Sequence, residues 1–137
     1  MSHSSIFPPR GHRPGGLIRA VLFGCALLAV ATPGFAAAAH PVQTRCGWFD
    51  NPTPGNAWLI DRDGEWTVSL QGGAEAEGPW PDFSPAQWTA TNGPHGHGCA
   101  CLVARVDPGE RRVLRILQAR ARPAAACRAE PGLKEPR

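Results

Sequence analysis

The sequence has no apolar run long enough to cross a membrane. Its most hydrophobic stretch, residues 20–31, is followed at once by the helix breakers Pro33 and Gly34. A membrane-spanning helix needs about 20 consecutive apolar residues. A membrane span that remains in the mature protein is therefore excluded.

The same stretch has the layout of a secretory signal peptide. Small residues at 36–39 follow it, and basic residues precede it: Arg10, Arg13 and Arg19. A basic region, a short apolar core and a small-residue cleavage site are typical of such leaders. We predict that residues 1–39 are removed and that the mature chain begins close to His40. A lipoprotein alternative would use Cys25, but bulky Phe23 stands where a small residue is expected.

The mature chain also lacks an excess of charge of either sign. The whole sequence has 14 Lys and Arg against 11 Asp and Glu, and the leader takes three arginines, so eleven of each remain. Without a net cationic field to attract phosphates, we expect no nucleic-acid partner. Acidic residues concentrate in the first half of the mature chain and arginines in the second. This pattern predicts two halves that attract each other, with a basic patch for an anionic ligand as the alternative.

Catalytic and cofactor motifs are absent as well. We find no Ser-His-Asp spacing, phosphate loop or cofactor signature, so we predict no cofactor and favour a non-enzymatic role. Asp61, Asp63 and Glu65 resemble part of a calcium loop, but the remaining ligands of an EF-hand are not in place. We interpret them as a solvated turn. A Cys-His nucleophile would need a free thiolate, which an oxidising compartment disfavours.

Four cysteines remain after the leader: Cys46, Cys99, Cys101 and Cys127. In an exported chain disulfides are the default, and four cysteines allow three connectivities. A Cys99–Cys101 bond is the least favoured, because residues two apart in a strand are separated by about 6.5–7 Å, near the upper limit for bridged Cα atoms. We predict that one of them bonds Cys46 and the other Cys127. The spacing leaves open which pairs with which.

The segment HGHGCAC, residues 95–101, alternates four residues of metal-ligand type. In a strand these would extend over about 20 Å, whereas the ligands of tetrahedral zinc must converge. Oxidised cysteines are also lost as ligands. His95 and His97, with His40, would then form at most a weak copper or nickel site. We favour a glycine-rich turn that enters a disulfide-bearing strand, and keep a redox or metal-handling role as the alternative function.

The clearest secondary-structure signal is a hairpin over residues 57–70, where apolar and polar residues alternate. A three-residue loop, 62–64 with Gly64 left-handed, would pair Asp61 with Glu65 and Ile60 with Trp66. This register places one set of side chains on a single apolar face: Trp58, Ile60, Trp66, Val68 and Leu70.

A second hairpin is predicted around the turn 107–110, with its register open. Between the hairpins, glycines and prolines exclude a long regular element, although Ser84 and Pro85 could start one helical turn that reaches Trp88. The fold class is therefore mainly β: a small disulfide-stabilised domain over 40–127, with two hairpins, long Gly/Pro-rich loops and at most a short helical turn. A loose tail follows at 128–137.

Five of the seven aromatic residues of the predicted mature chain are tryptophans. Trp58 and Trp66 fall on the apolar face of the first hairpin, so we assign them to the core. Trp48, Trp80 and Trp88 stand among Gly, Pro and Asn, where exposure and ligand binding are expected. The polar residues that would assist them are Asn51, Asn56 and Gln87.

Three stretches carry a family resemblance: RCGWFDNPTPGNAWLIDRDGEWTVSLQGG, FSPAQWTATNG and GCACL. Together they resemble a family of small exported proteobacterial proteins, domain of unknown function 4087 (DUF4087), from Arg45 to about Cys127. The resemblance implies a bacterial, periplasmic or secreted protein and supplies no catalytic residues. We expect a non-enzymatic binding module of the cell envelope, with an envelope protein or a glycan as its partner.

Overall fold

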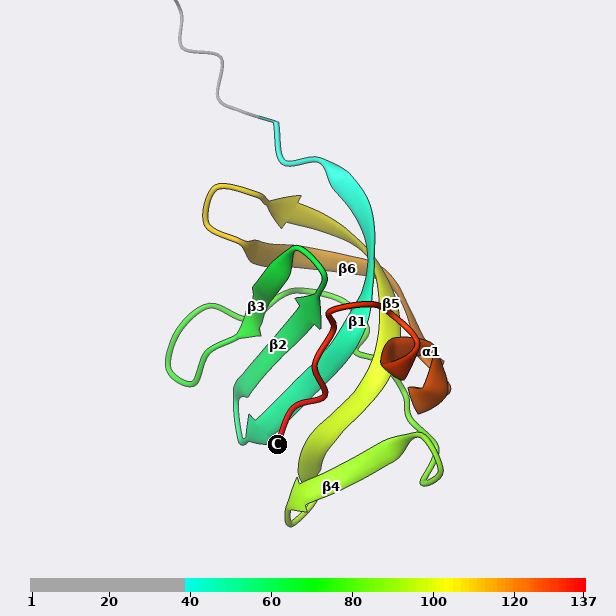
Figure 1. Cartoon of the computed structure of the whole chain (residues 1–137). Coiled ribbons are helices and arrows are strands. Elements are labelled where there is room, and N and C mark those ends of the chain that lie inside the picture. The colour runs from blue at the N-terminus through cyan, green and yellow to red at the C-terminus, as the bar shows by residue number, and fades with distance from the viewer. Residues whose placement is uncertain (1–38) are drawn as a thin grey trace, which may run out of the picture. The chain divides into compact units, whose positions relative to one another are not determined.

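The structure is a computed structural model that describes residues 39–137. All but the last residue of the predicted leader therefore lies outside the described residues. The described chain is mostly strand, as the sequence predicts. Its elements are β1 (Val42–Thr53), β2 (Asn56–Asp61), β3 (Gly64–Ser69), β4 (Trp88–Asn92), β5 (His95–Asp107), β6 (Arg112–Arg122) and α1 (Ala124–Arg128) (Figure 1).

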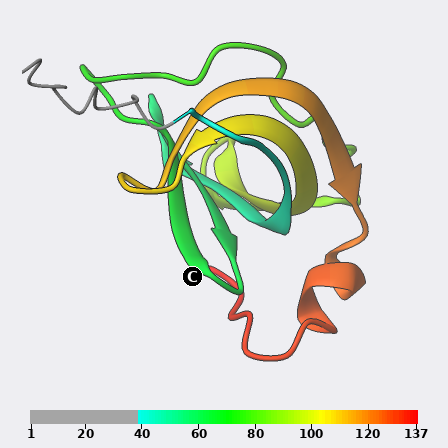
Figure 2. The ribbon, with the colours of Figure 1, turned by 90° about the horizontal axis from the view of Figure 1, so that it is seen from above.

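Five of the strands close into a barrel. Neighbours follow the order β1-β2-β3-β6-β5, and β1 also pairs with β5, which closes the ring (Figure 2). Within residues 39–137 the strands pair antiparallel except β3 and β6, which run parallel and meet at Thr67 and Arg112. β4 lies outside the ring, along the start of β5 (Figure 1). A five-stranded Greek-key barrel is the general architecture of OB-folds.

The interior of the barrel holds the main hydrophobic core. Every strand of the ring contributes to it, because alternate residues of each strand point inward. Its buried members are Phe49, Ala57, Leu59, Trp66, Val68, Ala76, Ala100, Leu102, Ala104, Val106, Val113 and Ile116. Burying a large aliphatic or aromatic side chain contributes roughly 1.5–3 kcal/mol. This core is therefore the main source of stability.

The register predicted for the first hairpin is wrong by one residue. The turn has two residues, and Leu59 pairs with Trp66 while Asp61 pairs with Gly64. Leu59 and Trp66 therefore share the buried face, and Trp58 is only half-buried on the opposite face of β2. The physical reason is Asp61, which accepts a hydrogen bond from the Asp63 N–H and pairs with the guanidinium of Arg45 at 2.6 Å. This ion pair joins residues far apart in the sequence, so the register could not be predicted from the alternation of apolar residues alone.

The second hairpin is confirmed. β5 and β6 pair antiparallel, and the Asp107 carboxylate accepts hydrogen bonds from the backbone N–H groups of Gly109 and Glu110. Arg111 closes the turn with a φ of 47°, in the left-handed region. Its carbonyl accepts the N–H of Thr67, so this turn also joins β6 to β3.

Two local predictions need correction. Residues 85–87 form a turn, and Trp88 begins β4 instead of ending a helix. The described helix is α1, at Ala124–Arg128. The tail at 128–137 is not loose, because Leu133 packs against a second cluster of Trp48, Cys99 and Cys127.

Two disulfides fasten β5 to its surroundings, and the two alternate cysteines take different partners as predicted. Cys101 bonds Cys46 on β1, and Cys99 bonds Cys127 on α1. Cys46 is exposed, whereas Cys99 and Cys127 are 2% and 3% exposed. The first bond joins paired residues of the neighbouring strands β1 and β5, and the second holds α1 and the tail against the barrel.

The predicted attraction between an acidic and a basic half is seen in only one ion pair of the described chain. Glu77 pairs with Arg115 at 3.4 Å, and both side chains are exposed. Other pairs lie within one half, such as Arg45 with Asp61 and Arg128 with Glu135. Most second-half arginines are therefore left without a carboxylate partner.

Candidate functional site

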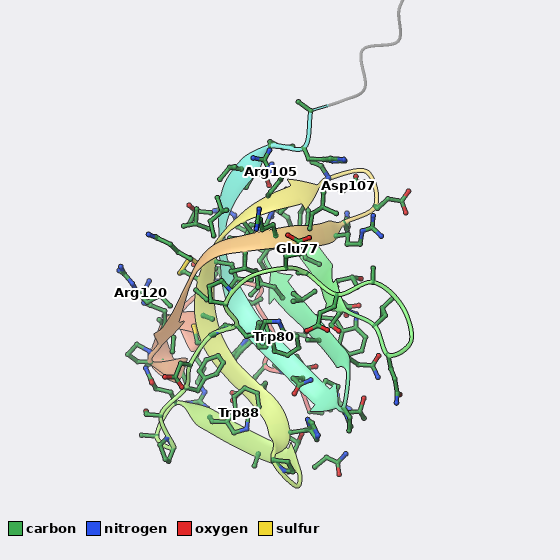
Figure 3. All side chains as sticks on the ribbon, turned by 180° about the vertical axis from the view of Figure 1, so that it is seen from behind. Glu77, Trp80, Trp88, Arg105, Asp107 and Arg120 are labelled. Carbon is green, nitrogen blue, oxygen red and sulfur yellow. A yellow bond between two sulfur atoms is a disulfide. The ribbon has the colours of Figure 1, made fainter. Side chains whose placement is uncertain are left out.

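The best candidate site is a cleft walled by four aromatic rings. Its volume is about 490 Å³, within the range of ligand pockets. We call it the aromatic cleft, and its lining is Phe49, Asn51, Trp80, Pro81, Phe83, Pro85 and Trp88. Trp80 and Trp88 lie on the same side of the barrel (Figure 3). The cleft joins β1, the loop between β3 and β4, and the start of β4.

The rings of the cleft are in mutual contact. The Phe49 ring lies 5.3 Å from that of Trp80 in an edge-on arrangement and 6.2 Å from that of Phe83. Phe83 and Trp88 follow at 5.0 Å. Phe49 is buried in the core, whereas Trp80, Phe83 and Trp88 are half-buried. The cleft is therefore an exposed continuation of the core, with one ring anchored in the barrel.

The glycines of HGHGCAC explain how β4 and the cleft lie so close to β5. A Cβ on Gly96 would stand within 1.9 Å of the Thr89 carbonyl oxygen, and one on Gly98 within 2.5 Å of the Phe83 ring. No larger side chain fits at either place without moving backbone or the aromatic ring. The alternation in this segment thus serves close packing and disulfide pairing.

The polar groups at the cleft are largely occupied within the protein. The Asn51 amide donates to the carbonyls of Thr53 and Asn56, and its oxygen faces Nδ1 of His95 at 2.9 Å. The Trp88 indole N–H donates to the Pro94 carbonyl. Trp80 is half-buried in the cleft wall, and no hydrogen bond of its indole N–H is found within residues 39–137.

Trp48 does not belong to this site. The prediction that it lies exposed in a loop is wrong, since it is 0% exposed and sits within β1. Neighbouring strand residues point to opposite faces, so Trp48 points outward where Phe49 points inward. The tail and the Cys99–Cys127 disulfide then cover it.

The structure gives Asn56 and Gln87 local structural roles. The Asn56 side-chain amide donates a hydrogen bond to the Thr53 hydroxyl, and its oxygen accepts one from the backbone N–H of Gln71. The Gln87 side-chain oxygen accepts from the backbone N–H and hydroxyl of Ser84. Of the residues predicted to bind a ligand, the structure brings Trp80, Trp88 and Asn51 together. Phe49 and Phe83 were missed, although Phe49 directly follows the predicted site residue Trp48 and Phe83 lies three residues after Trp80.

The candidate metal residues are engaged elsewhere. His95 faces Asn51, and His97 is 2% exposed, with its ring edge-on to Trp48 at 5.4 Å. Within residues 39–137 no three His, Cys, Asp or Glu side chains lie so that they could hold a metal ion. Both histidines are thus explained by protein contacts.

A second polar cluster lies under the tail, outside β1 and β5. Glu135 contacts Nε2 of His97 at 3.2 Å and accepts two hydrogen bonds from the Arg128 guanidinium at 2.8 Å. A carboxylate only accepts hydrogen bonds, so Nε2 carries the proton. The hydrogen bonds from Arg128, followed by that from His97, lower the pKa of Glu135 to about 2.

Asp50 lies opposite His97 in the pairing of β1 with β5, and burial raises the pKa of its carboxyl group.

We expect Glu135→Gln to loosen the tail. Trypsin cleavage after Lys134 should rise by up to about five-fold at neutral pH, the usual limit for a surface ion pair. Because the pKa of Glu135 is lowered in the folded state, its contribution is complete above the ordinary value of 4.5 and is lost as pH falls toward 2. The melting-temperature difference between wild type and variant should therefore shrink over that interval.

Glu130→Gln is the matched control, because the Glu130 side chain forms no ion pair in the described chain. Equal cleavage rates in wild type and Glu135→Gln, or a difference in melting temperature that persists at pH 2, would contradict this role of Glu135.

No helix among the described residues is long and apolar enough to cross a membrane.

Comparison with known proteins identifies one family of unknown function. No curated protein and no solved structure matches the chain. A family model described as "Protein of unknown function (DUF4087)" matches residues 40–134, which include all the strands and α1. The chain therefore belongs to the family DUF4087.

Proposed function

We propose that this protein is a non-enzymatic binding module of the cell envelope that holds an apolar segment of a protein partner in the aromatic cleft. The observation that carries the proposal is the wall of four contacting rings around about 490 Å³. Aromatic-lined grooves are a recurrent site for proline-containing and aliphatic peptides, because rigid rings bury large areas at low entropic cost.

The polar inventory of the cleft favours a peptide over a glycan. A sugar presents many hydroxyl groups that need partners, and both the Asn51 amide and the Trp88 N–H are already bonded within the protein. A proline-rich segment presents carbonyl oxygens with few backbone N–H donors, and one of these oxygens can accept the Trp80 N–H. The site therefore suits a ligand with few hydrogen-bonding demands.

Export to the periplasm or beyond is part of the same proposal. The leader-like sequence at 1–39 supports it, and so do two disulfides in a small domain, since such bonds persist in oxidising compartments. A bacterial, proteobacterial source for the family is proposed on the resemblance alone.

The test is selection of random dodecapeptides displayed on phage against the immobilised chain from residue 40. We expect enriched peptides to be proline-rich or aliphatic. Their affinity should fall more than ten-fold for Trp80→Ala, in line with loss of a central aromatic contact. Trp80→Phe should cost about five-fold, the loss of one hydrogen bond.

Trp58→Ala is the matched control, because Trp58 is also a half-buried tryptophan but lies on β2 outside the cleft. Circular dichroism checks that each variant is folded. Peptides that bind wild type and Trp80→Ala equally would contradict the proposal. So would cleft-dependent binding of peptidoglycan fragments in place of peptides.

A further inference from the structure

A second surface, separate from the aromatic cleft, gathers arginines on the outer side of the barrel. Residues that pair across strands share a face, so the register places Arg115 beside Arg105 and Arg120 beside Cys101. Arg122 follows Arg120 two residues later on β6. We call this outer side of β1, β5 and β6 the arginine face. Figure 3 labels Arg105 and Arg120 upon it.

The arginines of this face have few acidic partners. Arg115 pairs with Glu77, while Arg105 donates to the His40 carbonyl and Arg122 to the sulfur of Cys101. Arg120 is exposed and forms no ion pair in the described chain. Arg105 and Arg115 stand directly opposite each other, an arrangement of like charges that destabilises a sheet.

The acidic side chains nearest to the face do not neutralise it. Asp107 uses its carboxylate to cap the β5–β6 turn, and Glu77 is taken by Arg115. Glu130 borders the far end, where it lines a cavity with Arg122, but no ion pair forms between them. A cationic strip therefore persists on a chain whose mature part has little net charge.

Exposed aliphatic side chains lie beside the arginines. Val42 pairs with Arg105 across β1 and β5 and is 49% exposed. Leu117 is 45% exposed and lines a cleft of about 600 Å³ together with Val103, Arg120 and Arg122. Two of the three large exposed apolar side chains of the described chain are thus on this face. Arg105 and the Cys101 partner Arg120 mark two ends about 13 Å apart along β5, with Val42 beside the first end and Leu117 between the two.

We infer that the arginine face docks on an anionic phospholipid surface. Guanidinium groups bind phosphate oxygens in pairs of hydrogen bonds, and exposed aliphatic side chains enter the boundary between headgroups and acyl chains. An acidic protein would satisfy the arginines but would leave no reason for Val42 and Leu117 to be exposed beside them. The combination therefore favours a lipid surface.

The experiment is co-sedimentation of the chain from residue 40 with vesicles of phosphatidylcholine alone or with 30% phosphatidylglycerol. We expect binding only to the anionic vesicles. Each arginine near such a surface contributes roughly five-fold to the binding constant, so Arg105→Gln/Arg120→Gln should reduce it by about 25-fold. Arg62→Gln/Arg137→Gln is the charge-matched control, because both arginines are exposed and neither belongs to β1, β5 or β6. It should bind like wild type.

The variant Leu117→Ser distinguishes binding to a lipid surface from binding to a purely ionic partner. We expect it to weaken vesicle binding at both 50 and 300 mM salt, since contact with the acyl region is not screened. Equal binding by wild type and the Arg105/Arg120 variant would overturn the inference. It would also be overturned if polyglutamate, and not the vesicles, bound in an arginine-dependent way. Peptide binding by the aromatic cleft uses other residues, so either proposal can fail alone.

Discussion

Replacing Gly98 by alanine is expected to lower the melting temperature by about 8–20 °C and to disrupt the aromatic cleft. The new Cβ would lie 2.5 Å from the Phe83 ring and 2.8 Å from the carbonyl oxygen of Gln87. The oxygen belongs to the backbone, and the ring is held between Phe49 and Trp88. Neither can move without opening the cleft. Differential scanning fluorimetry and tryptophan emission measure the two effects.

Gly109→Ala provides the control for this substitution. Its Cβ would meet only the Asp107 side chain, at an ordinary 3.4 Å, so the melting temperature should change by less than about 2 °C. If Gly98→Ala has the melting temperature and tryptophan emission of wild type, the inferred close contact between Gly98 on β5 and the Phe83 ring of the cleft is wrong.

Removing the Cys99–Cys127 disulfide is expected to have the other large effect. The bond closes a loop of 28 residues, for which the chain-entropy model gives about 3.5 kcal/mol. Cys99→Ala/Cys127→Ala should therefore melt about 15–25 °C lower than wild type. The variant also releases α1 and Leu133 from Trp48. Trypsin should then cleave rapidly after Arg128.

The second disulfide gives a matched comparison. Cys46→Ala/Cys101→Ala opens a loop of 55 residues, worth about 4 kcal/mol on the same model, yet it leaves α1 and the tail attached. Its melting temperature should fall by a similar amount without faster cleavage after Arg128. Equal cleavage in the two variants would mean that Cys99–Cys127 does not hold the tail.

The local features of this fold could be predicted from the sequence. Cysteine spacing makes a Cys99–Cys101 bond the least favoured on distance, and the structure confirms that the two cysteines take different partners. The β5–β6 hairpin follows from a turn sequence whose Asp107 caps its own backbone. The cleft was predicted in part, because Trp80 and Trp88 stand among residues that break regular structure.

The features that depend on distant contacts could not be predicted. The ion pair between Arg45 and Asp61 turns Asp61 inward and shifts the β2–β3 register by one residue. The tail covers Trp48 because Leu133 returns to it from the end of the chain. Phe49 joins the cleft only once the barrel has closed. In each case the deciding partner is far away in the sequence.

The pairing of Cys46 with Cys101 and of Cys99 with Cys127 is tested most directly by counting thiols in pairwise variants. Trypsin cannot separate Cys99 from Cys101, because only Ala100 lies between them. We would therefore measure the intact mass of exported Cys46→Ala/Cys101→Ala after treatment with iodoacetamide under non-reducing conditions. The structure predicts no adduct on this variant and two on Cys46→Ala/Cys99→Ala. The reverse result, or adducts on unreduced wild type, would contradict the disulfide-fastened barrel.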